Sequence, residues 1–335
     1  MTRPMIFITQ PIEESALRRL LSVAQVEVHP DSTKTITKEC LVRGVRGNDF
    51  LFCRLGDQVD AEVISANTKL KLIATMASGS GGIDVATATK FRIPVIGRTI
   101  DKQGNSGISE ETADLTWALL MAVARRILEG DRLVRLGIFP GPHSMHLLGS
   151  GIYGKDIGII GMGKIGRAIA RRAQAFGMRI SYYSKNRHLD VEEQYSAAYL
   201  PLDDLLQAVD FVCTLPLYSA DTHHMIGNRE LGLMKRTAFL INTSRGPVVD
   251  QQALLNALSM KKIAGAALDV FEGEPHPVLP EELIAMPNVV LTPHIGSAVA
   301  EKREIMTNEI VNEIISFIQG KTPSLLFNPE VLGKS

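Results

Sequence analysis

The middle of the chain carries the sequence Asp156-Ile157-Gly158-Ile159-Ile160-Gly161-Met162-Gly163-Lys164-Ile165-Gly166. It is an apolar, strand-like run that leads into a G-x-G-x-x-G pattern, and a helical pattern follows at residues 167–176. In this pattern Gly161 permits the tight turn, Gly163 lets a pyrophosphate approach the backbone, and Gly166 lets the helix pack on the strand. The helix N-terminus then offers free N–H groups to the phosphates. Because the strand and the helix flank the glycines, the pattern predicts a dinucleotide-binding turn formed by residues 161–166.

Short apolar runs alternate with helical patterns on both sides of this turn. After it, strands are predicted at residues 179–184, 211–216, 238–242, 265–270 and 289–293. Before it, strands are predicted at residues 5–9, 26–29, 49–53, 70–76 and 91–96, with a helix at 14–24. One long helix is predicted at 109–136, because Trp117, Leu120, Met121, Ala124 and Leu128 form an apolar stripe. The alternation predicts an α/β protein with two Rossmann-like or flavodoxin-like domains, parallel sheets and a cleft between the domains.

Length and composition agree with two globular domains. The chain has 335 residues, 36 Lys plus Arg and 36 Asp plus Glu, so its formal net charge is zero. A domain averages roughly 150 residues. The balanced charge offers no footprint for nucleic acid or an acidic membrane. No apolar run is long enough to span a bilayer, and the N-terminus lacks the features of a signal peptide.

Three scattered cysteines, Cys40, Cys53 and Cys213, form no C-x-x-C pair. The sequence therefore predicts no disulfide framework and no metal site. We expect reduced, buried thiols in a cytoplasmic protein, with Cys53 and Cys213 acting as small apolar side chains inside strands.

The end of the strand after the glycine turn indicates which dinucleotide is bound. An NAD-binding unit usually places Asp or Glu about 20 residues on, where the carboxylate binds the ribose 2′-hydroxyl. Here Ser184 stands 18 residues after Gly166, followed by Lys185, Asn186 and Arg187, and this stretch has no acid. A hydroxyl and two cations can bind and neutralise a 2′-phosphate. We therefore expect a preference for NADP(H), with NAD(H) as the alternative cofactor.

Three segments follow late strands, where ligands bind in open α/β sheets. Arg245 lies in Asn242-Thr243-Ser244-Arg245-Gly246-Pro247, and a guanidinium fixed by such a turn suits capture of a carboxylate. The second segment, residues 269–275, carries three carboxylates within six positions. We interpret one of them, Glu272, as a solvated charge. In the third segment, Thr292-Pro293-His294-Ile295-Gly296, His294 stands between a strand end and a glycine turn. Because histidine changes charge near neutral pH, His294 is the candidate acid/base.

The other seven histidines show no comparable setting. One of them, His29, ends a strand, and six lie in loops or polar contexts that suggest no shared site: His143, His146, His188, His223, His224 and His276.

The chain resembles the NAD(P)-dependent D-2-hydroxyacid dehydrogenases. The glycine turn, the N-T-S-R-G segment, the D-V-F-x-x-E-P segment and the T-P-H-I-G-S segment occur in that family in the same order. The resemblance extends from Met5 to about Asn328. Within the family the chain is most similar to glyoxylate/hydroxypyruvate reductases and 2-ketogluconate reductases. The segments 221–224 and 245–250 add to that similarity.

The resemblance implies a role for each matching residue. Arg245 matches the substrate-binding arginine, His294 the acid/base and Glu274 the carboxylate that pairs with it. A carboxylate beside an imidazole favours the charged form of the ring and fixes its orientation. The Met76–Gly79 loop matches the loop that receives the substrate carboxylate, with Ser78 and Gly79 expected to bind substrate. Asp269 matches the residue that holds the nicotinamide carboxamide, and Thr112 matches a helix-start residue facing the cofactor. Further cofactor contacts are expected from Leu215, Pro216, Thr222 and Thr243.

The expected reaction is the reduction of a small 2-keto acid to the D-2-hydroxy acid. The resemblance implies a substrate (catalytic) domain at residues 1–104 plus 296–335 and an NAD(P)-binding domain at 105–295. It also implies a homodimer built by the helix and arm at 109–150.

Three positions depart from the family pattern. Ser80-Gly81-Gly82 replaces larger residues on the substrate side, Asp114 stands where many members have Glu, and Phe139 stands where many have Trp.

Other readings of the same sequence remain open. Phosphite-oxidising enzymes resemble this family but carry Lys where this chain has Ser78. Transcriptional corepressors on this fold sense dinucleotides without catalysis, but they carry a long tail, whereas this sequence stops at Ser335. A structural nucleotide-binding protein would leave Arg245, Glu274 and His294 unexplained.

Overall fold

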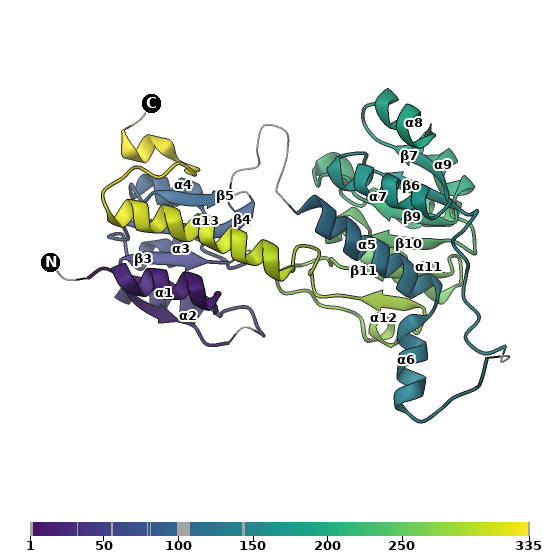
Figure 1. Cartoon of the computed structure of the whole chain (residues 1–335), viewed down its shortest axis with the longest axis horizontal. Coiled ribbons are helices and arrows are strands. Elements are labelled where there is room, and N and C mark those ends of the chain that lie inside the picture. Colours follow the sequence, from purple (N-terminus) through teal and green to yellow (C-terminus); the bar gives the residue numbers. More distant parts are fainter. Residues whose placement is uncertain are drawn as a thin grey trace. The chain divides into compact units, whose positions relative to one another are not determined.

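The structure of the protein is a computed structural model that describes residues 3–31, 33–54, 56–78, 80, 82–98, 108–142 and 145–333. The chain divides into two compact units, drawn in Figure 1. Unit 1 contains the described residues of Met1–Gly107 and Val299–Ser335, and unit 2 contains those of Ile108–Ala298.

Unit 1 is a parallel sheet flanked by helices. Its strand order is β2-β1-β3-β4-β5. The strands are β1 (Met5–Ile8), β2 (Gln25–Val28), β3 (Phe50–Cys53), β4 (Leu72–Ser78) and β5 (Val95–Arg98). The helices are α1 (Glu14–Val23), α2 (Lys38–Gly47), α3 (Ala61–Ser65), α4 (Val85–Lys90) and α13 (Ala300–Ile318). The last helix, α13, packs on α1 and β4 (Figure 1). Its residues Ile310, Val311 and Ile314 are buried against apolar residues of the sheet.

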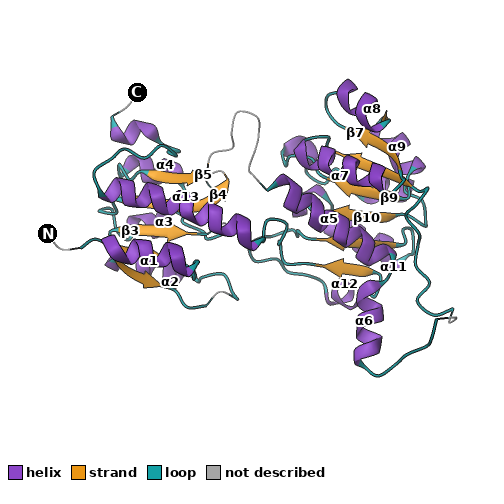
Figure 2. Ribbon diagram, viewed as in Figure 1, coloured by secondary structure: helices purple, strands orange, loops and turns teal. Residues whose placement is uncertain are grey.

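Unit 2 is a larger parallel sheet with the order β12-β11-β10-β9-β6-β7-β8 (Figure 2). The strands are β6 (Asp156–Ile160), β7 (Arg179–Tyr183), β8 (Ala198–Tyr199), β9 (Phe211–Thr214), β10 (Phe239–Asn242), β11 (Gly265–Leu268) and β12 (Val289–Leu291). The helices are α5 (Ser109–Ala124), α6 (Ile127–Arg135), α7 (Lys164–Ala175), α8 (Leu189–Tyr195), α9 (Leu202–Ala208), α10 (Asn228–Leu233), α11 (Gln251–Ser259) and α12 (Glu281–Ala285).

Side chains of successive residues in the central strand β6 pack into two different hydrophobic cores. Ile159 packs in the core that includes α5 and α7, whereas Ile160 packs in the core that includes α9 and α11. A strand covered on both faces must be apolar at every position, which explains the unbroken run in the sequence. Strand order reverses at β6, which has β9 on one side and β7 on the other. Ligands bind at such a switch point, beyond the carboxyl ends of the strands. The predicted α/β class with parallel sheets is confirmed.

The predicted single helix at 109–136 is wrong. The structure has α5 and α6 in its place, because Arg126 adopts a left-handed backbone conformation with φ of +52° and ends the regular helix. Leu128, the last member of the expected apolar stripe, is therefore 51% exposed.

Smaller differences concern strand limits. The strand expected at 91–96 begins only at Val95, because Phe91 caps the end of α4. The short strand β8 was not predicted, because two residues are too few to show the alternating pattern of a strand.

Two of the three cysteines are buried, as expected, whereas Cys40 is only half-buried. Burial raises the pKa of the Cys213 thiol to about 12 and also raises the pKa of Cys53.

None of the described helices combines the length and apolarity that crossing a bilayer requires. Within the same residues, no group of three or more His, Cys, Asp or Glu side chains is arranged to hold a metal ion.

Candidate active site

The glycine turn of unit 2 has the geometry that a dinucleotide phosphate needs. Gly161 has a φ of +100°, and a Cβ there would lie 2.6 Å from the backbone of Leu215. A Cβ on Gly166 would lie 2.3 Å from the carbonyl oxygen of Gly161, so glycine lets α7 pack closely. A Cβ on Gly163 would meet no atom within 4 Å, which leaves open space at the N-cap of α7. Open space beside a helix N-terminus suits an anionic phosphate, so these residues fit the cofactor.

Of the other residues expected in this turn, Met162 and Ile165 pack against the core beside α7. Met162 is buried, while Lys164 and Ile165 are half-buried at the helix start. Leu215 and Pro216 follow β9 on the same sheet edge, and the N–H of Leu215 donates to Ile160. Thr222 lies in a short 3-10 turn (Ala220–Thr222), where its hydroxyl donates to the carbonyl of Leu217.

The basic turn after β7 has a more complex charge arrangement than the sequence indicated. Lys185, Asn186 and Arg187 are exposed, and the Ser184 hydroxyl donates to the carbonyl of Asn186. Arg187, however, forms an ion pair with Glu192 of α8. The turn itself has no acidic residue, as predicted. In the fold, however, the carboxylate of Glu192 in the next helix lies beside the turn.

Arg245 is positioned by a residue that the sequence analysis missed, Asn242. Its side chain is buried at the end of β10. The Oδ1 atom accepts from the Ser244 N–H at 3.1 Å and from the Thr214 hydroxyl at 2.9 Å, while Nδ2 donates to the carbonyl of Arg245 at 3.1 Å. The sequence did contain a signal for Asn242, because a polar residue stands there at the end of an apolar strand. Asn242 thereby fixes the backbone that presents the Arg245 side chain.

The Arg245 guanidinium remains available for a ligand. Its Nη1 donates to the carbonyl of Ser244 at 2.7 Å, and no carboxylate in the described parts of the chain pairs with it. The next residue, Gly246, lies against the backbone of the 269–275 loop. A Cβ on Gly246 would fall 1.9 Å from the carbonyl carbon and oxygen of Phe271. The loop of Arg245 and the loop that carries Glu274 are therefore in direct backbone contact.

Asp269 organises the loop before His294. Its carboxylate is buried at the end of β11. One oxygen accepts from the Thr292 hydroxyl at 2.6 Å and from the Ile295 N–H at 2.8 Å, and the other accepts from the Gly296 N–H at 2.9 Å. Both carboxylate oxygens are thus used within the protein.

His294 and Glu274 are brought together as the resemblance implied. Nδ1 of His294 lies 2.6 Å from Oε2 of Glu274, while Oε1 of Glu274 accepts from the Phe271 N–H at 2.7 Å. The imidazole is about one-third exposed. Because Nδ1 is occupied by Glu274, Nε2 is the nitrogen that remains for a substrate.

Threonine hydroxyls of α5 connect these loops. Thr112 donates to Ile108 at 2.9 Å and lies 3.3 Å from the carbonyl oxygen of Gly296. Thr116 and Thr243 share a hydrogen bond of 2.7 Å. The sequence analysis considered the apolar stripe of this helix and not Thr116, which directly precedes its first member, Trp117.

The rings of His223 and His224 stack at 4.0 Å. The expectation for a neighbouring residue, Glu272, is wrong. Glu272 is not a free solvated charge, because its Oε1 lies 2.7 Å from Nε2 of His224 and accepts from the Gln251 N–H at 3.3 Å. The contacts of Glu272 with His224 and Gln251 join residues that lie 48 and 21 positions apart in the sequence, so no local pattern could have revealed them.

The first three residues of the expected substrate loop of unit 1 form the end of β4, and the fourth lies outside the described residues. Gly79 is among the residues not described, and Ser78 is known only as the last residue of β4.

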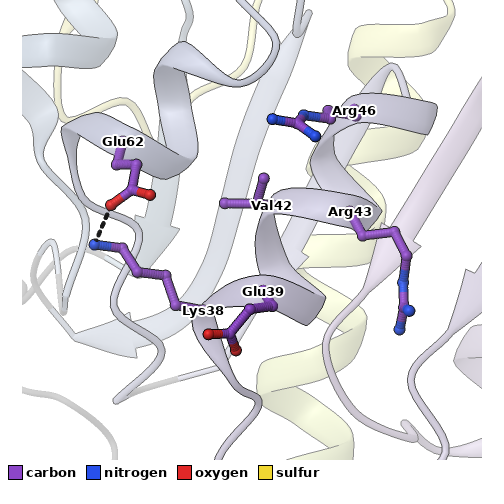
Figure 3. A pocket seen from close by; sticks show the side chains of 6 residues that line it. All are labelled: Lys38, Glu39, Val42, Arg43, Arg46 and Glu62. Carbon is purple, nitrogen blue, oxygen red and sulfur yellow. Dashed lines mark ion pairs between the residues drawn. The ribbon is translucent and has the colours of Figure 1, made fainter.

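Two surface hollows among the described residues lie elsewhere. One, of about 470 Å³, is lined by polar side chains of α2 together with Val42 and Glu62, and Lys38 there pairs with Glu62 at 2.6 Å (Figure 3). Another, of about 500 Å³, lies near Arg236 and Met286. Neither contains the residues that carry the chemistry.

The geometry provides a free guanidinium, a histidine oriented by a carboxylate and a phosphate-binding turn, all at the carboxyl edge of one sheet. β10, β11 and β12 are adjacent and parallel, so the residues that follow them share that edge. Such a set can bind an anionic oxygen and move a proton next to a dinucleotide.

Comparisons with known proteins agree with this reading. The sequence model of "D-isomer specific 2-hydroxyacid dehydrogenase, NAD binding domain" matches residues 117–296. A glyoxylate reductase from Thermococcus onnurineus is 44% identical over 334 residues, covering 98% of this chain and 97% of the relative.

Solved structures give the same picture. A glyoxylate reductase from Paecilomyes thermophila has a TM-score of 0.74 at 28% identity, covering 98% of this chain and 100% of its own. An NADPH-dependent glyoxylate/hydroxypyruvate reductase from Sinorhizobium meliloti, solved with NADP and malonate, has a TM-score of 0.73 at 28% identity, covering 97% of each chain.

Proposed function

The chain belongs to the D-isomer specific 2-hydroxyacid dehydrogenases, an NAD(P)-dependent oxidoreductase family, and from this membership we propose that it reduces a small 2-keto acid with NADPH. The substrate class is of the glyoxylate, hydroxypyruvate or 2-ketogluconate type, and the product is the D-2-hydroxy acid. The observation that carries the proposal is the 2.6 Å contact between His294 and Glu274 on the sheet edge that also carries Arg245.

In the proposed reaction each side chain has a defined role. The reduced nicotinamide supplies the hydride for the 2-keto carbon. Arg245 binds substrate and stabilises the negative charge that grows on the carbonyl oxygen. His294 donates the proton from Nε2 and also contacts substrate, while Glu274 holds the imidazole through Nδ1. By resemblance, Ser78 and Gly79 of unit 1 receive the substrate carboxylate, so unit 1 is the proposed substrate domain.

The NADPH preference rests on the turn after β7. Ser184, Lys185, Asn186 and Arg187 supply a hydroxyl, an amide and two cations where a 2′-phosphate would lie. The NADP bound to the Sinorhizobium meliloti relative supports this choice. Further proposed cofactor contacts come from Leu215, Pro216, Thr222, Thr243, Asp269 and Thr112.

Absorbance at 340 nm tests the proposed reaction. Purified protein is mixed with NADPH or NADH and with glyoxylate, hydroxypyruvate or 2-ketogluconate in turn. We expect NADPH oxidation that depends on the keto acid and exceeds NADH oxidation. Faster NADH oxidation would overturn the cofactor preference and leave the chemistry intact. Tight NADPH binding without turnover of any keto acid would overturn the reductase proposal itself.

We also propose that the chain forms a homodimer through the arm at 109–150. Helix α6 buries none of its residues within the chain. Leu136 and Phe139, which follow it, are 64% and 80% exposed. Large apolar side chains gathered on one segment mark an interaction surface, and a second copy of this chain is the proposed occupant.

Light scattering after size exclusion tests the dimer. The wild type is expected at twice the 36.6 kDa of one chain. A double variant, Leu136→Asp with Phe139→Asp, should run as a monomer, because buried charges in the interface would remain unpaired. Met260→Asp, another exposed apolar position at 67% exposure, should remain dimeric. A monomeric wild type would refute the proposal.

A further inference from the structure

Arg187, a cation expected to bind the 2′-phosphate, already has a carboxylate partner. Its Nε donates to Oε1 of Glu192 at 2.8 Å, and its Nη2 donates to Oε2 at 2.7 Å. The two parallel hydrogen bonds make a bidentate pair, the arrangement in which an arginine would also bind a phosphate. One edge of the Arg187 guanidinium is therefore already hydrogen-bonded to Glu192.

The pair lies where the fold places the adenosine ribose. The N–H of Gly161 donates to the carbonyl of Tyr183 at 2.8 Å, so the glycine turn and the end of β7 are neighbours. The turn with Ser184 and Arg187 begins directly after Tyr183. A dinucleotide-binding fold uses this position to distinguish a ribose hydroxyl from a phosphate.

Glu192 is held firmly in this position. The Tyr182 hydroxyl donates to its Oε1 at 2.8 Å, and the same hydroxyl accepts from the His188 N–H at 2.7 Å. The Arg187 guanidinium holds the pKa of the Glu192 carboxyl at about 2, so the carboxylate is charged throughout the neutral range. Its side chain is 18% exposed, whereas that of Arg187 is 60% exposed.

The surrounding charges leave little free positive charge on the turn. Arg167 pairs with Asp190, and its Nη2 lies 3.3 Å from Nδ1 of His188. Lys185 is exposed, and no carboxylate in the described parts of the chain pairs with it. A 2′-phosphate that approaches this turn thus meets one free cation and two cations that already have acidic partners.

We propose that Glu192 is a specificity-determining residue that limits the preference for the 2′-phosphorylated dinucleotide by competing with the 2′-phosphate for Arg187. The proposal rests on the NADPH-dependent function proposed above. A phosphate must break the Arg187–Glu192 pair or bind beside a fixed carboxylate of like charge. A ribose with a free 2′-hydroxyl carries no such charge and incurs neither cost. Glu192 therefore narrows the difference in affinity between NADPH and NADH.

Calorimetric binding of 2′,5′-ADP and 5′-AMP tests the competition without requiring turnover. Glu192→Gln retains an oxygen that can accept from Tyr182 but removes the charge. We expect this variant to tighten 2′,5′-ADP binding about two- to fivefold, the size expected for release of an exposed ion pair. Affinity for 5′-AMP should not change. The affinity for NADPH relative to that for NADH should rise by the same factor.

Two controls separate local competition from a general change in charge. Glu193→Gln removes an exposed acid next to Glu192 on the same helix and should change neither affinity. In the Arg187→Gln background, Glu192→Gln should tighten 2′,5′-ADP binding much less than in the wild-type background, because no arginine is released and only the like charge is removed. Unchanged melting temperatures verify that α8 remains folded.

The outcomes for the two proposals are distinct. If Glu192→Gln leaves the affinity ratio unchanged or weakens 2′,5′-ADP binding, Glu192 merely orients Arg187 and the inference is overturned. If wild-type protein binds 2′,5′-ADP no better than 5′-AMP, the NADPH preference fails. Even then, a higher ratio of 2′,5′-ADP affinity to 5′-AMP affinity in Glu192→Gln than in the wild type would support the competition.

Discussion

Replacing His294 by alanine is expected to lower kcat for keto acid reduction by about 10²–10⁴-fold, the usual contribution of a positioned general acid. The reason is geometric. Glu274 occupies Nδ1 at 2.6 Å, so the imidazole presents Nε2 as its proton donor, and alanine removes that donor. Affinity for NADPH should remain, because the glycine turn that binds the phosphates is a separate segment. Steady-state kinetics and calorimetry measure the two effects.

His276→Ala is the matched control for His294. It removes an exposed imidazole two residues from Glu274, and it should leave turnover unchanged. Retention of most of the wild-type kcat by His294→Ala would show that the proton comes from elsewhere. Loss of NADPH binding together with turnover would instead indicate a folding defect, which a melting curve would reveal.

Gly246→Ala is expected to damage both stability and activity. The added Cβ would fall 1.9 Å from the carbonyl carbon and oxygen of Phe271, and 2.5 Å from the nitrogen of Glu272. These are backbone atoms, so the two loops must separate. Overpacking of this kind costs about 1–3 kcal/mol of unfolding free energy, occasionally more. A shift of about 1 Å in a catalytic group can cost about 10²-fold in rate, and Arg245 and Glu274 flank the contact.

Gly232→Ala provides the control for the added methyl group. Gly232 lies exposed on α10, and a Cβ there would meet no atom within 4 Å. Alanine in that helix should raise stability by about 0.4–1 kcal/mol and leave kcat unchanged. Urea unfolding and kcat/KM are measured for both variants. If Gly246→Ala behaves like Gly232→Ala, the two loops do not constrain each other and the argument from their contact fails.

Local patterns were sufficient wherever short-range geometry sets the structure. The glycine turn was predicted because a positive φ at Gly161 and the close approach at Gly166 are properties of adjacent backbone. Strands β6 and β9 were predicted because they are buried on both faces and must be apolar.

Longer-range features escaped the sequence analysis. The helix break at Arg126 escaped prediction, since the apolar period continues across it. The pairing of His224 with Glu272 joins two loops 48 residues apart. Asn242 was passed over because its role lies in the hydrogen bonds of its side chain, one of which comes from Thr214 of the neighbouring strand β9.

The α/β class, the family, the dinucleotide turn and the residues that match catalytic positions all follow from the amino-acid sequence, because each is encoded in a contiguous motif. The resemblance had implied the pairing of Glu274 with His294, and the fold shows that it is made through Nδ1. The contact of Gly246 with Phe271 and the ion pair of Arg187 with Glu192 are visible only in the folded chain. Electrostatic interactions depend on distance in space, and the parallel sheet brings the ends of distant strands to one edge. The cations of the Ser184–Arg187 turn are visible in the sequence, but their partners are set by the packing of α8.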